Sequence, residues 1–86
     1  MAIRVLIADD HPLVRQGLKA ALAPVPEVEV VAEAATGQEA IREAVLHQPD
    51  VVVMDLQMPE GNGIEATREL ARALPSAAVL VLRAQR

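Results

Sequence analysis

The run Val51–Val52–Val53–Met54 is the most uniformly apolar segment of this chain, and the carboxylate of Asp55 follows it at once. A strand this apolar is typical of the interior of a parallel sheet, where helices cover both faces. Turn-forming residues come next, over positions 57–63. The stretch therefore predicts a central strand that delivers an acidic side chain to one edge of a sheet.

Three further segments have the pattern of strands, and they are Ile3–Ala8, Glu27–Ala34 and Ala78–Leu82. Segments with apolar residues at helical spacing separate all four strands. Strands that alternate with helices imply a parallel sheet with right-handed crossovers. The predicted fold class is therefore α/β.

The helices have recognisable ends. Pro12 suits the first position of a helix, because its missing N–H would have no partner there. Thr36 and Glu39 form a capping box, in which each side chain is expected to accept the backbone N–H of the other residue. Pro49 ends that helix, and Asn62 can cap the next one. The predicted apolar faces comprise Val14, Leu18, Ala21 and Leu22 in the first helix, Ala40, Ile41, Ala44 and Val45 in the second, and Ile64, Thr67, Leu70, Ala71 and Leu74 in the third.

Composition excludes several classes of protein. The 86 residues are 52% hydrophobic and contain no cysteine, which argues against a disordered chain, a disulfide scaffold, a zinc ribbon and thiol catalysis. The formal net charge of -4 and the scattered arginines disfavour binding of nucleic acid. The apolar runs are too short to span a membrane. We expect one small domain in the cytoplasm.

Three of the four aspartates follow strands. Asp9 and Asp10 come directly after the first strand, and Asp55 comes after the third. Ligands of open α/β sheets bind at the carboxyl ends of strands, so these side chains converge if the two strands are neighbours. Converging carboxylates repel one another, and Mg²⁺ is their natural neutraliser. The alternative is that the three aspartates only cap the first helix and a turn.

The sequence resembles the receiver domain of two-component response regulators, in the NarL/FixJ/LuxR-type subfamily. Four segments carry the resemblance, in order and at the right spacing: Ala8–Leu18, Val51–Asp55, Leu56–Pro59 and Gly61–Gly63. The fold it implies is flavodoxin-like, of the CheY type. Numbered along the chain, its strands would lie in the order 2-1-3-4, with the fifth strand–helix unit absent.

The resemblance also implies roles for individual residues. Asp55 would be the phosphoacceptor, taking a phosphoryl group from a phosphohistidine of a partner histidine kinase. Asp10, Asp55 and the backbone carbonyl of Gln57 would hold Mg²⁺, and Asp9 would act through a metal-bound water. The domain would then be a phosphoacceptor signalling module of a transcription regulator and not an enzyme.

The chain departs from the family pattern in ways that bear on signalling. Arg83 occupies the position of the family's switch Ser or Thr. The only lysine is Lys19, on the first helix, so the lysine that pairs with the phosphate in the family has no counterpart here. We interpret residues 1–86 as a partial receiver domain without the DNA-binding domain of a longer parent, and expect impaired switching. The strand Ala78–Leu82 would have an unpaired apolar edge, so we expect a homo-oligomer formed through that edge and the uncovered sheet faces.

Two other functions compete with phosphorelay signalling. One is a non-switching structural or oligomerisation fragment with the receiver fold. The other is a Mg²⁺-dependent phosphohydrolase with Asp55 as nucleophile, which Gln57 disfavours because such enzymes usually carry a second Asp there. His11 is interpreted as a loop residue before Pro12 and not as a ligand.

Overall fold

A computed structural model describes residues 2–55 and 63–82 of the chain. Its elements, in order, are β1 (Ile3–Ala8), α1 (Pro12–Leu22), β2 (Val28–Ala34), α2 (Gly37–His47), β3 (Val51–Asp55), α3 (Gly63–Ala73) and β4 (Ala78–Leu82). The strands form one parallel sheet in the order β2-β1-β3-β4. The predicted fold class and strand order are both confirmed. None of the helices in the described ranges is long and apolar enough to cross a membrane.

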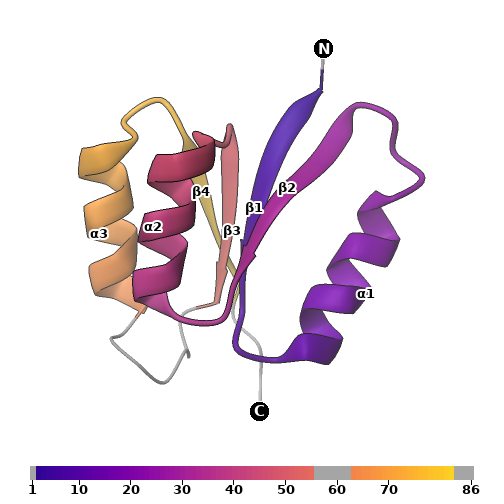
Figure 1. Cartoon of the computed structure of the whole chain (residues 1–86), viewed down its shortest axis with the longest axis horizontal. Helices are drawn as coiled ribbons and strands as arrows, with labels where there is room; N and C mark the ends of the chain where they lie inside the picture. The colour runs from indigo at the N-terminus through magenta and orange to yellow at the C-terminus, as the bar shows by residue number, and fades with distance from the viewer. Residues whose placement is uncertain (1, 56–62, 83–86) are drawn as a thin grey trace.

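The molecule has three layers (Figure 1). Helices α2 and α3 lie on one face of the sheet, and α1 lies on the other. The core sits between the sheet and the α2–α3 layer. It comprises Leu6, Ala8, Ala34, Ala40, Ala44, Val52, Met54, Ala66, Leu70 and Leu74, with Ala32, Ile41, Ala77 and Val79 packed at its margin.

The opposite face of the sheet is covered unevenly. Ile7, Val53 and Leu80 are register partners across β1, β3 and β4, so their side chains share this face. Ile7 is 0% exposed, Val53 is half-buried and Leu80 is 56% exposed. Exposure therefore rises with distance from α1, which packs on β1 and β2. The prediction that β3 is covered on both faces is right for the α2–α3 side, whereas Val51 and Val53 on the other side are only half-buried.

The capping box of α2 is confirmed in one half and corrected in the other. The Thr36 hydroxyl accepts the Glu39 N–H at 3.1 Å, as expected. The Glu39 carboxylate, however, accepts the N–H of Ala35 at 2.9 Å, one residue before the expected partner. Asn62, predicted to cap α3, lies outside the described residues.

The buried faces of the helices also differ from the predicted ones. Ala66 and Leu70 of α3 and Leu74 directly after it are buried while Ala71 is exposed, because positions four residues apart stack on one side of a helix. Val45 of α2 is 53% exposed, and α1 has no fully buried residue. Periodicity located each helix correctly, but the described buried residues match the predicted apolar stripes only in part.

Arg4 ties the start of β1 to the end of α2. Its guanidinium donates to the backbone carbonyls of His47 and Gln48, the latter at 3.0 Å. These carbonyls lie at the negative end of the helix dipole and have no partners within the helix. The Arg4 N–H donates to the Asp50 carboxylate at 2.8 Å, and the Asp50 N–H donates back to the Arg4 carbonyl at 2.8 Å. This pair of hydrogen bonds fixes β3 against β1 at the amino-terminal ends of the strands, opposite to Asp9 and Asp55.

We predict that Arg4→Ala lowers the free energy of unfolding by about 1–2 kcal/mol, because it removes charged donors from helix-terminal carbonyls. Urea unfolding followed by far-UV circular dichroism measures this, since the chain has no aromatic residue to report by fluorescence. Arg42→Ala is the matched control. The Arg42 side chain is 71% exposed and lies 4.0 Å from Glu43, so its loss should cost less than about 0.5 kcal/mol. Equal effects of the two changes would contradict the role given to Arg4.

Candidate functional site

The sheet places Asp9 and Asp55 at neighbouring strand ends. Strands β1 and β3 pair in parallel, and Ala8 lies opposite Met54. The next residues along each strand are Asp9 and Asp55, so both side chains emerge at the same edge of the sheet. The adjacency that the sequence analysis required is therefore present.

Asp9, Asp10, His11 and Asp55 each offer a ligand atom, and these atoms all lie within 4.8 Å of one another. The burial within this acidic cluster is unequal: Asp9 is 2% and Asp55 is 0% exposed, whereas Asp10 is half-buried. The expected convergence of three aspartates is confirmed. Gln57 and Arg83, the other residues assigned to the site, lie outside the described residues.

His11 lies in the connection before Pro12, as expected, and its ring also belongs to the acidic cluster, so its interpretation as a residue other than a ligand stays a prediction. Its Nδ1 lies 2.9 Å from an Asp10 carboxylate oxygen and 3.4 Å from an Asp9 oxygen. His11 is also the N-cap residue of α1, directly before Pro12, and its side chain makes no capping hydrogen bond. The sequence did carry a signal for this position, because His11 directly follows Asp9 and Asp10 and its ring therefore lies at the same strand end.

Asp9 is held at several atoms. Its backbone N–H donates to the Ala34 carbonyl at 2.9 Å, which anchors it to the end of β2. One carboxylate oxygen accepts the His11 N–H at 2.8 Å. This bond gives Asp9 the turn-stabilising role that was the alternative to a metal site. The two roles are compatible, because an ionised carboxylate has two oxygens and about four lone-pair positions.

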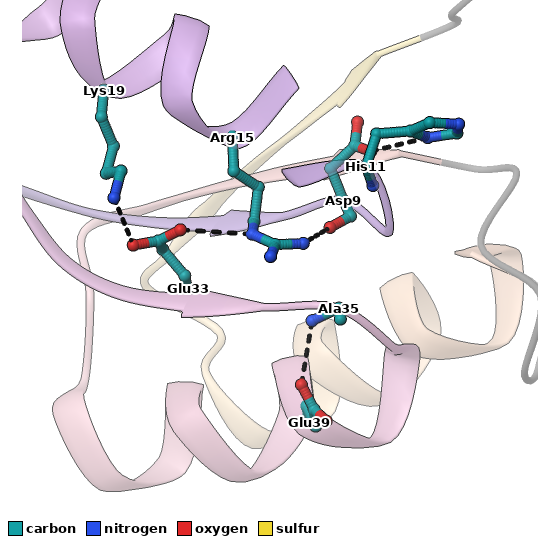
Figure 2. Close-up of polar contacts among 7 residues, drawn as sticks. All are labelled: Asp9, His11, Arg15, Lys19, Glu33, Ala35 and Glu39. Atoms are coloured by element: carbon teal, nitrogen blue, oxygen red, sulfur yellow. Dashed lines mark hydrogen bonds and ion pairs between the residues drawn. The ribbon is translucent and has the colours of Figure 1, made fainter. Parts of the chain in front are cut away.

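A second charged group lies beside the acidic cluster, and sequence reasoning missed it (Figure 2). Arg15 of α1 donates from Nε to the Glu33 carboxylate of β2 at 3.2 Å and from Nη1 to the backbone carbonyl of Asp9. Lys19, one helical turn later, donates to the second Glu33 oxygen at 2.8 Å. We call Arg15, Lys19 and Glu33 the charged bridge. A sequence signal existed in the i, i+4 spacing of the two basic residues, but their acidic partner is distant in sequence.

The protein environment displaces the pKa of Glu33 in a clear direction. The hydrogen bond from Lys19 holds the pKa of Glu33 below its ordinary value of 4.5, against the opposing effect of burial. The charge of Lys19 and the hydrogen bond and charge of Arg15 add to the lowering. Folding therefore favours the ionised form of this carboxylate.

The acidic cluster suits a hard divalent cation. Carboxylate oxygens are the ligands that Mg²⁺ prefers, and it commonly uses one or two of them together with water. Two of the carboxylates are almost completely withdrawn from solvent, and burial makes the repulsion between like charges larger than it is in water. A cation bound among them would offset that repulsion.

Comparison with known proteins places this site in a family. A sequence profile described as "Response regulator receiver domain" matches residues 5–86. The transcriptional regulatory protein DegU of Brevibacillus brevis is 48% identical over 80 residues, which cover 93% of this chain and 34% of that protein. This chain spans only about a third of the length of such a relative.

Solved structures agree with the sequence match. A two-component response regulator of the LuxR family from Aurantimonas sp. SI85-9A1 is 40% identical, with a TM-score of 0.91, over 100% of this chain and 61% of that one. The isolated receiver domain of RcsB from Salmonella enterica serovar Typhimurium, solved in the presence of the phosphomimetic BeF3-, is 31% identical with a TM-score of 0.91. The match covers 100% of this chain and 64% of the RcsB chain.

The Glu33 contacts predict a dependence of stability on pH. Because the pKa of Glu33 is lowered by folding, its contribution is fully present above its unfolded pKa and is lost as pH falls through its folded pKa. We expect Glu33→Gln to lower the unfolding free energy by less than about 1 kcal/mol at neutral pH, since the pairs are partly exposed. Denaturant unfolding at neutral pH and at about pH 3 measures the difference between wild type and variant. The difference should shrink in acid, and a constant difference would contradict the account.

Proposed function

The chain belongs to the response regulator receiver domain family, among its NarL/LuxR-type members, and from this premise we propose that it accepts a phosphoryl group on Asp55. Receiver domains are signalling domains of two-component systems and not enzymes in the usual sense. Their phosphoryl groups come from histidine kinases. The observation that carries the proposal is the burial of Asp55 at 0% exposure at a strand end, within 4.8 Å of further carboxylates.

The chemistry required of Asp55 is nucleophilic attack. A carboxylate oxygen of Asp55 forms a bond to phosphorus as the phosphorus–nitrogen bond of the phosphohistidine breaks, and the electron pair of that bond returns to the imidazole of the donor. Phosphoryl transfer depends on positioning and on stabilising the charge of the transferred group. The place of Asp55 in β3, paired to β1 on one side and to β4 on the other, supports the positioning part.

Receiver domains generally bind Mg²⁺ at an acidic pocket, and the acidic cluster here has the matching oxygen donors. In the proposed site Asp10, Asp55 and the backbone carbonyl of Gln57 hold the ion, and Asp9 acts through a bound water. The ion, when bound, supplies positive charge that neutralises the phosphoryl oxygens. The bond from the Asp9 N–H to the Ala34 carbonyl and the bond that the Asp9 carboxylate accepts from the His11 N–H support a fixed orientation of Asp9.

The wider role follows the relatives. DegU is described as a transcriptional regulatory protein, and we propose that a longer protein containing this chain regulates transcription in the same way. We propose that residues 1–86 bind neither nucleic acid nor a membrane. We also propose that the domain lies in the cytoplasm, where a kinase would phosphorylate it. The modified residue would act by adding negative charge at the carboxyl end of β3, as phosphorylation does elsewhere.

Arg83 supports a second candidate, a non-switching module with the receiver fold. A hydroxyl at this position can hydrogen-bond a phosphoryl group and move inward with it, whereas a guanidinium is much larger. Arg83 could pair with phosphate by charge but could not reproduce that movement. We therefore propose that phosphorylation of Asp55 is impaired, and that the modified state is transmitted poorly.

Intact-mass spectrometry after incubation with a small phosphodonor and Mg²⁺ tests these proposals. We expect partial addition of one phosphoryl group to the wild type, dependent on Mg²⁺, and none to Asp55→Asn. Asp50→Asn is the matched control, because it makes the same chemical change at the opposite end of β3 and should be modified like the wild type. Arg83→Thr should be modified more completely. Modification of Asp55→Asn, or none of the wild type, would contradict the assignment.

We further propose that the 86-residue polypeptide self-associates. Within the described residues β4 pairs with β3 only, and Leu80 exposes 56% of its surface on the sheet face beside that edge. An unpaired strand edge next to an apolar face favours pairing with a second copy. Since β4 pairs with β3 along one side, the backbone N–H and C=O groups on its other side are available to such a partner.

Light scattering after size exclusion at micromolar concentration measures the mass in solution. We expect an oligomer for the wild type and a shift toward monomer for Leu80→Lys, which places a charge on the exposed face. Leu13→Lys introduces the same charge on α1, where Leu13 is 80% exposed, and should leave the oligomer intact. A well-folded wild-type monomer would refute self-association through this surface.

A further inference from the structure

We propose that Arg15 is a positioning residue for the metal site: its guanidinium sets the orientation of the Asp9–Asp10 peptide and thereby the direction of the Asp10 carboxylate. The inference rests on the proposed function, since Asp10 matters here as a ligand. It goes beyond that function because the described contacts of Arg15 go to the Asp9 backbone carbonyl and to Glu33, and Arg15 is not one of the residues assigned to hold the ion or the phosphoryl group. Figure 2 shows Arg15 between Asp9 and Glu33.

Arg15 joins three separate elements. It extends from the first turn of α1, where its own N–H donates to the His11 carbonyl at 3.1 Å. Its side chain reaches the Glu33 carboxylate on β2 and the Asp9 carbonyl in the β1–α1 connection. Only 19% of the side chain is exposed, so these contacts form in a partly desolvated place, where charged hydrogen bonds are stronger. The planar guanidinium presents several donors at fixed angles, which lets one side chain hold two acceptors.

The Asp9 carbonyl is a sensitive point of attachment. Peptide bonds are planar, so the Asp9 oxygen and the Asp10 nitrogen lie in one rigid plane with the Cα atoms on either side. The Asp9 N–H is already fixed by its bond to the Ala34 carbonyl at 2.9 Å. A donor on the Asp9 oxygen therefore fixes the remaining rotation of the plane. The Cα of Asp10, from which the carboxylate extends, is then held in one position.

Charge and position make opposite predictions for the loss of Arg15. A positive side chain near a cation site repels the cation, so a purely electrostatic role predicts tighter Mg²⁺ binding when Arg15 is removed. A positioning role predicts weaker binding, because the ligand loses its orientation. Lys19 serves as a matched control. It has the same charge and pairs with the same Glu33 carboxylate, whereas Arg15 also donates to the Asp9 carbonyl.

The test is calorimetric titration of the full 86-residue chain with MgCl2 at constant ionic strength. Arg15→Ala should weaken Mg²⁺ binding about tenfold, at the lower end of the losses seen when residues supporting metal ligands are changed. Arg15→Lys should weaken it nearly as much, because a lysine keeps the charge and loses the two-acceptor geometry. Lys19→Ala should stay within about twofold of the wild type, since it leaves the Asp9 contact in place. Far-UV circular dichroism verifies that each variant is folded.

Unchanged or tighter binding by Arg15→Ala would overturn the inference, and so would full rescue by Arg15→Lys or an equal loss in Lys19→Ala. Amide hydrogen exchange without metal provides the second readout. Exchange at the Asp10 and His11 amides should be faster in Arg15→Ala than in Lys19→Ala, and equal rates would also overturn it. If the wild type fails to bind Mg²⁺, the proposed metal site is wrong, and the exchange rates alone decide the role of Arg15.

Discussion

Repulsion between carboxylates that two adjacent strands place side by side is the constraint on which the rest of this structure depends. Asp9 and Asp55 are nearly fully buried, and Asp10 and His11 complete a group whose ligand atoms lie within 4.8 Å of one another. Burial of like charges opposes folding unless hydrogen bonds or a cation offset it. The surrounding contacts, from the His11 N–H to the guanidinium on the Asp9 carbonyl, hold the chain in this arrangement.

The layers around the sheet explain how that arrangement is maintained. Packing on the α2–α3 side buries Ala8 and Met54, which directly precede Asp9 and Asp55 in the sequence. On the other side, α1 packs on β1 and β2 and carries Arg15 to the acidic cluster. At the amino-terminal ends of the strands, hydrogen bonds between Arg4 and Asp50 hold β1 and β3 together. The site is thus built between two strands that are fixed at both ends.

Much of the fold could be predicted from particular residues, because their signals are local. Pro12, Thr36 and the apolar run before Asp55 located two helix starts and a strand, and the position of the aspartates after strands one and three was enough to predict their convergence. Apart from that convergence, side-chain contacts between segments distant in sequence could not be predicted. Nothing local pairs Arg15 with Glu33, and the preference of Glu39 for the Ala35 N–H depends on the geometry of the chain entering α2. The exposure of Val45 and Leu80 depends on which elements cover them.

The central claim is that the buried carboxylates form a site for a divalent cation. The most direct measurement is the free energy of unfolding in urea, compared between MgCl2 and NaCl at equal ionic strength and followed by far-UV circular dichroism. An ion that binds the folded state stabilises it by RT ln(1 + [L]/Kd), which is about 1.4 kcal/mol at ten times Kd. The account predicts a stability that rises with Mg²⁺ concentration in this way. Identical stability in the two salts at all concentrations would contradict it.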